Sequence, residues 1–273
     1  APPPWLLKAS SWVLKVKISP SNADNDSDSI GENSNSSPAI LQGFPPGAYP
    51  PFENIHESAL EEVDGRPQRR GTSASVCILR CSDSPVGPYD ELILLPGGFR
   101  NPRTRDVTSR ISSAYVSSES SAWNGRRNWN IPKHLARFEW EPAGPRRTIL
   151  RVYHHADAPS PFSTTKPFFT ATLSNARFLG VYIPPVFLGK RSWMIQPPLN
   201  EGVSAIAVST LSWLSITPKY KGRWSFGYAE PVSEDRGGLP AFGDGVSFPK
   251  LVLASKRGMT FKGDLVFVKA DDI

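Results

Sequence analysis

The chain has 273 residues, of which 39% are hydrophobic, and it contains 28 prolines and 21 glycines. This length can bury a sizeable core, and frequent proline and glycine favour short strands joined by turns over long helices. No stretch reaches the roughly 18 apolar residues of a membrane span, and the run APPPWLLKASS lacks the features of a signal peptide. We therefore expect a cytoplasmic protein.

The formal net charge of +6 is unevenly distributed. Eleven basic and four acidic residues lie between Arg100 and Arg151. A local positive field attracts anionic small molecules or nucleic acid, although most residues in charge runs are simply solvated. No nucleic-acid-binding signature accompanies these arginines. We expect neither a nucleic acid nor a membrane as a partner.

The cysteines and histidines do not form a metal-binding pattern. In a strand, Cys77 and Cys81 would lie ~13 Å apart, which is too far for a disulfide. The four histidines lack ligand spacing with cysteines or carboxylates; they are His56, His134, His154 and His155. A glycine-rich phosphate loop and a G-x-S-x-G elbow are also absent. We expect no metal and no cofactor.

The first part of the chain contains one strand followed by a long polar region. Residues 5–18 alternate and are rich in β-branched residues, which predicts a strand. Residues 19–37 are acidic and of low complexity, which predicts a flexible insertion. We interpret residues 44–71 as a surface excursion without chemistry, with a single helical turn at 57–62.

The middle of the chain predicts a hairpin, a further strand and a helix. Residues 75–81 and 89–95 read as strands that pair as a hairpin, and residues 109–117 read as another strand. A helix is expected over 119–129, with Ser117 or Ser118 as its cap and Glu119 early in it. It ends before Pro132, because the residue that precedes a proline is pushed toward extended geometry.

Downstream the pattern is β throughout, and nothing marks a domain boundary. We therefore expect one domain over residues 1–273, of the α+β class, mainly antiparallel β with few short helices. The strands expected in this part lie at residues 137–141, 148–154, 167–173, 202–208, 223–228, 250–254 and 264–269.

Two blocks of sequence carry a resemblance to a known family. The first is Gly87-Pro88-Tyr89-Asp90-Glu91, and the second is residues 115–135, with Gly-Arg at 125–126 and Pro-Lys at 132–133. In order and spacing, these blocks resemble the acetoacetate decarboxylase family, and especially its fungal branch. The resemblance implies a closed or cone-like β-barrel core and a homo-oligomer.

The resemblance also implies the site. The lysine after the proline, Lys133, is expected to form a Schiff base with the substrate ketone, and Glu91 to point into the same pocket. Acetoacetate decarboxylase is the established example of a lysine amine activated by its surroundings, since desolvation or a nearby cation lowers the pKa of an amine. Trp129, Ile131 and Leu135 are candidates for the apolar wall.

Two further residues are substrate-binding candidates. Arg126 offers a cation for the substrate carboxylate or for activation of the amine, as does its neighbour Arg127, and His134 directly follows the lysine. The alternative for the arginines is a set of salt bridges that hold the loop. The implied reaction is decarboxylation of a small-molecule β-keto acid through an imine and an enamine.

The sequence departs from the decarboxylase pattern in three respects, which keeps other functions open. His134 replaces a second lysine and Arg127 replaces a glutamate, and the first strand shows no counterpart of an N-terminal arginine. One alternative is a Schiff-base aldolase or dehydratase on the same scaffold. Another is a non-catalytic barrel that binds a hydrophobic ligand. The fungal-type likeness suggests a larger, polyketide-derived keto acid of secondary metabolism.

Overall fold

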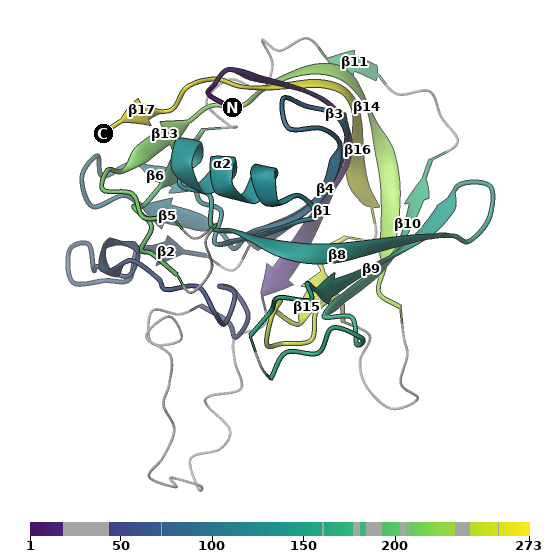
Figure 1. Ribbon diagram of the computed structural model, residues 1–273, viewed down its shortest axis with the longest axis horizontal. Coiled ribbons are helices and arrows are strands. Elements are labelled where there is room, and N and C mark those ends of the chain that lie inside the picture. Colours follow the sequence, from purple (N-terminus) through teal and green to yellow (C-terminus); the bar gives the residue numbers. More distant parts are fainter. Residues whose placement is uncertain are drawn as a thin grey trace, which may run out of the picture.

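The computed structural model describes residues 1–18, 44–71, 73–159, 161–176, 181–183, 193–202, 206, 208–232, 241–255 and 257–273. It consists mainly of strands arranged around one α-helix, α2 (Glu119–Trp129), as Figure 1 shows. The first strands are β1 (Trp5–Ile18), β2 (Arg69–Arg70), β3 (Ser73–Asp83), β4 (Tyr89–Leu95), β5 (Gly98–Arg100), β6 (Val107–Ser109) and β7 (Ser113–Val116), with a 3-10 turn η1 (Glu57–Ala59). The later strands are β8 (Lys133–Pro142), β9 (Arg147–His154), β10 (Phe169–Asn175), β11 (Val181–Ile183), β12 (Met194–Gln196), β13 (Leu214–Ile216), β14 (Lys219–Glu230), β15 (Leu251–Leu253), β16 (Arg257–Phe267) and β17 (Asp271–Asp272).

The larger sheet closes on itself. Its strand order is β10-β9-β8-β7-β4-β3-β1-β16-β14-β11, and an additional antiparallel pairing of β10, at one end, with β14, next to the other end, closes a ring (Figure 1). Nearly all neighbouring strands are antiparallel, and the predicted 75–81/89–95 hairpin forms between β3 and β4. The expected fold class, mainly antiparallel β with a closed core and few helices, is confirmed. No helix in the described part of the chain is long and apolar enough to cross a membrane.

Helix α2 connects the two parallel strands of the ring. β7 and β8 run side by side with Ala114 opposite Lys133, and a parallel pair needs a crossover connection of this kind. The helix begins as the sequence predicts, because the Ser118 side chain accepts a hydrogen bond from the backbone N–H of Ser121. It ends at Asn130, whose left-handed backbone (φ 51°) turns the chain. Lys133 is therefore the first residue of β8.

Alternation along the strands separates two hydrophobic cores. On β4, Leu92 and Leu94 face the first core, to which strands from all around the ring contribute. Tyr89 and Ile93 face the second core, which lies between the sheet and α2. The start of β1 passes over the helix (Figure 1), and the rings of Trp5 and Trp129 meet edge to face at 5.2 Å between centroids. The second core contains the candidate site.

Two predictions about chain segments were wrong. The single strand expected at 109–117 is instead two strands, β6 and β7, which belong to different sheets. The strand is interrupted at Ile111, because the Gln196 side chain hydrogen-bonds both the N–H (2.9 Å) and the carbonyl (3.1 Å) of that residue. The region 44–71 is not a surface excursion, since Phe44 and Val63 are buried in it. The expected insertion at 19–37, and most of the strand expected at 202–208, lie outside the described residues.

Candidate active site

Lys133 and Glu91 lie together in the second core. The lysine Nζ is 2.9 Å from Oε1 of Glu91, and both side chains are almost completely buried, at 6% and 4% exposed. The two residues come from β8 and β4, with β7 between them in the sheet. Nζ also donates to the Ser121 hydroxyl at 3.3 Å and lies 5.4 Å from the centre of the Tyr89 ring. The two residues that the sequence selects as catalytic candidates are thus in contact.

The helix leaves a narrow channel for the lysine side chain. Lys133 runs past Gly125, and a Cβ atom on that glycine would lie only 2.5 Å from Cδ and 2.6 Å from Cε of the lysine. Carbon atoms in ordinary contact lie about 3.5–4.0 Å apart. The absence of a side chain at position 125 therefore allows the lysine to extend toward Glu91.

A largely apolar cavity opens beside the lysine amine. It offers about 80 Å³ to the centres of water-sized molecules, and one water needs roughly 10–15 Å³ on that measure. Among the lining residues that the structure describes, Lys133 alone carries a cationic side chain and Glu91 alone a carboxylate. The other lining residues are Trp5, Leu7, Cys77, Leu79, Tyr89, Ile93, Leu95, Ile111, Trp129, Ile131, Met194, Pro218, Tyr220, Leu265 and Phe267.

The cavity wall disfavours ionisation of its thiol and phenol groups. Burial, reinforced by the charge of Glu91 and by Cys81, raises the pKa of the Cys77 thiol to about 12. Burial and the Glu91 charge also raise the pKa of the Tyr89 phenol well above its usual range. Both groups therefore stay neutral at physiological pH and add no charge to the cavity.

No protein-family model and no curated protein matches the chain by sequence. Its structure is similar to acetoacetate decarboxylase from Legionella pneumophila, with a TM-score of 0.57 and 11% identity, over 100% of this chain and 88% of that one. The fold is acetoacetate decarboxylase-like. Other similar structures are the enduracididine biosynthesis enzyme MppR complexed with pyruvate (TM-score 0.52, 14% identity, 100% and 91% covered) and an acetoacetate decarboxylase-like enzyme from Sphingomonas wittichii (0.51, 12%, 100% and 94%). The fungal branch stays a prediction.

Within the acetoacetate decarboxylase-like fold, the predicted site residues fall into two groups. Trp129 and Ile131 line the cavity with Lys133 and Glu91. Trp129 is fixed by a hydrogen bond from its indole N–H to the Val268 carbonyl, at 2.9 Å. Leu135 packs against the second core without lining the cavity, and Arg127, which is exposed, lies over the Trp123 ring at 4.9 Å.

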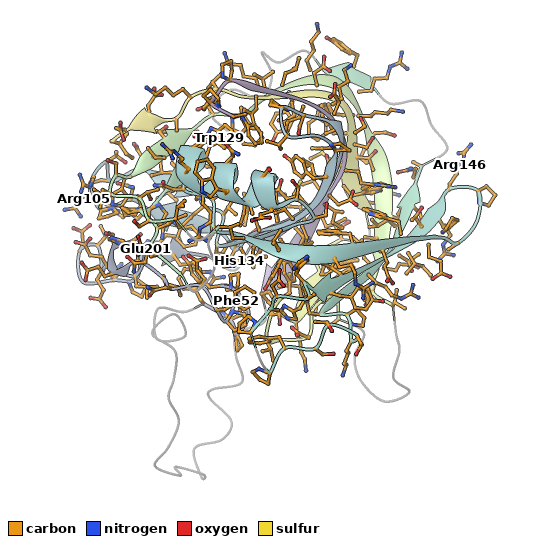
Figure 2. The ribbon with its side chains drawn as sticks, in the orientation of Figure 1. Phe52, Arg105, Trp129, His134, Arg146 and Glu201 are labelled. Carbon is orange, nitrogen blue, oxygen red and sulfur yellow. The ribbon has the colours of Figure 1, made fainter. Side chains whose placement is uncertain are left out.

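Arg126 and His134, predicted to bind substrate, lie outside the cavity lining and contact a different residue. Both bind the buried carboxylate of Glu53: Arg126 donates two hydrogen bonds to it, at 2.7 and 3.1 Å, and His134 Nε2 lies 2.5 Å from Oε2. Successive side chains of a strand point to opposite faces, so His134 turns away when Lys133 turns in. Figure 2 shows His134 next to Phe52, and their ring centroids are 4.6 Å apart. For Arg126, the salt bridge that the sequence left open as an alternative is the arrangement present.

Glu53 is the buried charge that the sequence reasoning missed. Burial alone would raise its pKa, but hydrogen bonds and charges from His134 and Arg126 lower the pKa to about 2. It sits in a proline-rich stretch without strand or helix periodicity, and Arg126 is 73 residues away in sequence. The one feature of the sequence that could have indicated a buried carboxylate is the position of Glu53 next to Phe52 in an aromatic, proline-rich run. The cluster joins the end of α2 to the start of β8.

Metal ligation is not a feature of the described residues. No three His, Cys, Asp or Glu side chains in that part of the chain come together in a way that could hold an ion. The chemistry that the site offers is thus that of an amine, a carboxyl group, a hydroxyl and an apolar wall.

Proposed function

We propose that the protein is an imine-forming lyase in which the Lys133 amine attacks the carbonyl carbon of a keto substrate. The observation that carries the proposal is the contact of 2.9 Å between buried Lys133 and buried Glu91 at the wall of an otherwise apolar cavity. The likeness of the fold to acetoacetate decarboxylase and to MppR supports it as an analogy.

The first step needs the amine without its extra proton. Two buried charges are costly to desolvate, and transfer of one proton from Nζ to the Glu91 carboxylate leaves a neutral amine beside a neutral acid. The contact distance suits such a transfer. Oε1 of Glu91 makes no aligned hydrogen bond, so no other described donor competes for that oxygen.

The imine then forms with Glu91 as the proton donor. The nitrogen lone pair forms the C–N bond, the carbonyl π pair moves to oxygen, and the Glu91 acid protonates that oxygen. The amine nitrogen loses a proton, the hydroxyl leaves as water after a second protonation, and a cationic iminium remains next to the Glu91 carboxylate. The carboxylate stabilises this cation in a medium of low dielectric.

With a β-keto acid the iminium accepts the electrons of the departing carboxylate. The bond between the α-carbon and the carboxylate breaks, its electron pair forms the C=C bond of an enamine, and CO₂ leaves. The enamine carbon takes a proton, and water hydrolyses the imine to return the amine and the product ketone. We place decarboxylation first among the reactions for this site.

A specific observation favours a second candidate, an aldolase or dehydratase that uses the same imine. The described lining offers no cation besides Lys133 for a substrate carboxylate, because Arg126 is engaged by Glu53. A neutral carbonyl substrate fits such a lining as well as a keto acid does. In this reaction the iminium accepts electrons from a breaking C–C bond to a neutral carbon group, or an α-proton is lost before water leaves.

The deciding experiment combines trapping with product analysis. The protein is incubated with a β-keto acid or a 1,3-diketone, reduced with borohydride and digested, and the adduct is located by mass spectrometry. The proposal expects an adduct at Lys133 that is absent in Lys133→Ala, with Lys8→Ala as the control, because Lys8 is an exposed lysine. CO₂ release lost in Lys133→Ala identifies the decarboxylase, and carbon–carbon cleavage without CO₂ identifies the aldolase. No adduct at Lys133 with any carbonyl compound rejects both.

A further inference from the structure

The cavity beside Lys133 is too small for a large substrate. The 80 Å³ that its interior offers to the centres of water-sized molecules holds about five to eight waters, at roughly 10–15 Å³ for each. A carbonyl group with a few attached carbons fills that space. Any longer substituent on the substrate has to leave the cavity through its mouth.

The mouth lies on the side formed by β3, β4, β14 and the end of β16. The lining residues Trp5, Leu7 and Trp129 are fully buried, whereas the lining residues Cys77, Leu95, Tyr220 and Phe267 are only partly buried. The residues that mark the opening carry no charge, so an apolar group can pass them without displacing water from an ion.

A row of apolar side chains leads from this mouth to the surface. The pairing registers place Ile93 opposite Cys77, Cys77 opposite Val13, Val13 opposite Met259, and Met259 opposite Phe226. Residues directly opposite one another on neighbouring strands point to the same face of the sheet. We call Val13, Met259 and Phe226 the apolar row; it crosses β1, β16 and β14.

Exposure increases steadily along this line. Ile93 is 9% exposed at the cavity, Cys77 and Val13 are partly buried, Met259 is 45% exposed and Phe226 is 63% exposed. With a strand spacing of about 4.8 Å, the line from Cys77 to Phe226 is roughly 14 Å long. An exposed apolar strip that continues a cavity wall is the surface expected for an apolar ligand.

We infer that the substrate is a carbonyl compound with an extended apolar chain, held with its carbonyl at Lys133 and its chain along the apolar row. The inference rests on the proposed imine chemistry and specifies the class of substrate. The chain is the part of the molecule that supplies affinity, because the described lining offers one ion pair and otherwise few polar partners.

The test is borohydride trapping at Lys133 with acetylacetone and a series of homologues in which one methyl is replaced by a progressively longer alkyl chain. The half-saturating concentration is expected to fall about two- to fourfold per methylene while the chain buries apolar area. It should level off once the chain passes Phe226. Equal half-saturation across the series would overturn the inference, whereas failure of every diketone to form an adduct would reject the imine chemistry itself.

Surface variants distinguish binding of the alkyl chain along the apolar row from nonspecific binding to any exposed apolar side chain. Phe226→Ser should raise the half-saturating concentration of the longest homologue about fivefold and leave that of acetylacetone unchanged. Val107→Ser is the matched control, since Val107 is also exposed (58%) but lies on β6 of the other sheet. A Phe226→Ser/Met259→Ser double variant that keeps the full chain-length dependence contradicts the assignment.

The same variants distinguish a ligand from a second copy of the chain on this surface. Light scattering should give one molar mass for the parent protein, Phe226→Ser and Val107→Ser. A lower mass for Phe226→Ser alone, with equal loss of trapping for short and long diketones, would assign the row to an interface between copies and overturn the substrate inference.

Discussion

The carboxylate of Glu91 lies 2.9 Å from the amine of Lys133, and this contact brings together two strands that are not neighbours in the sheet. Glu91→Gln keeps the shape of the side chain but removes its ability to accept and return a proton. General acid–base catalysis contributes about 10²–10⁴-fold, so the rate of adduct formation at Lys133 should fall by at least about 100-fold. Stopped reactions at saturating diketone measure this rate, and a rate equal to that of the parent would remove Glu91 from the mechanism.

The same pair should be dispensable for folding. Replacing a buried ion pair by apolar residues of similar volume is often neutral or stabilising by about 1–4 kcal/mol, whereas removing one partner is destabilising. Lys133→Met/Glu91→Leu is therefore expected to unfold in urea at or above the parent midpoint, and Lys133→Met alone below it. If the double variant proves less stable than the single one, the pair is there for stability and the catalytic interpretation loses its main support.

Gly125→Ala should remove activity without unfolding the protein. The new methyl would lie 2.5 Å from Lys133 Cδ, which forces the flexible lysine chain to move away from Glu91. Alanine is favoured over glycine inside a helix by about 1 kcal/mol, which offsets the local crowding. We expect trapping at Lys133 to drop about 10- to 100-fold, because misplacement of a reacting group by about 1 Å costs up to 10²-fold.

Thermal unfolding and trapping are measured on the same Gly125→Ala preparation. Ser120→Ala, at an exposed position of the same helix, is the control and should retain full trapping. Unimpaired trapping in Gly125→Ala would show that the lysine does not need this channel.

Acid should weaken the fold through Glu53. The pKa of this carboxyl is about 2 in the folded protein and 4.5 in its ordinary state. Because the folded pKa is the lower one, the unfolded state binds the proton first, and stability is lost as pH falls from about 4.5 toward 2. The shift corresponds to on the order of 3 kcal/mol.

Urea midpoints over this pH range test the role of Glu53. Glu53→Gln should flatten that part of the pH dependence and lower stability at pH 7. Glu230→Gln removes an exposed pair with Arg147, at 3.6 Å, and should change stability by less than about 1 kcal/mol. Identical pH dependence in the parent and Glu53→Gln would exclude Glu53 as the source.

The thiols should react slowly in the native protein. Burial raises the pKa of both Cys77 and Cys81 to about 12, and only the thiolate is nucleophilic. At pH 8 the thiolate fraction is then about 10³-fold smaller than for an ordinary thiol of pKa near 8.5. Alkylation by iodoacetamide, followed by mass spectrometry, should be that much slower than in urea. It should also rise with pH up to about 12; complete native labelling within minutes at pH 8 would contradict the burial of these groups.

Local sequence signals predicted what is local in this fold. The cap at Ser118, the stop before Pro132 and the β3–β4 hairpin each depend on a few neighbouring residues, and each is present as expected. Two short sequence motifs led to the prediction that Glu91 and Lys133 share one pocket. Most residues of the cavity wall around this pair were not predicted. They come from distant parts of the chain, and no rule of sequence spacing connects Trp5 to Phe267.

Two substrate-binding candidates, Arg126 and His134, lie outside the cavity lining. Arg126 and His134 were grouped with Lys133 because they are close in sequence, but strand alternation turns His134 away, and the partner of both is Glu53. A carboxylate that lies 73 and 81 residues from its partners leaves no periodic trace in the sequence. Buried polar clusters of this kind form only when distant segments pack together in the folded protein, so local sequence patterns do not predict them.

The placement of β1 beside β16 has a consequence for when the protein acquires its chemistry. Leu7 of β1 pairs with Leu265 of β16, and both line the cavity that encloses Lys133. During synthesis the lysine is made long before β16 emerges from the ribosome. Until that strand docks, the cavity around Lys133 lacks one of its walls. Under the proposed imine chemistry, the site of Lys133 is therefore complete only after β16 has been made and has docked against β1.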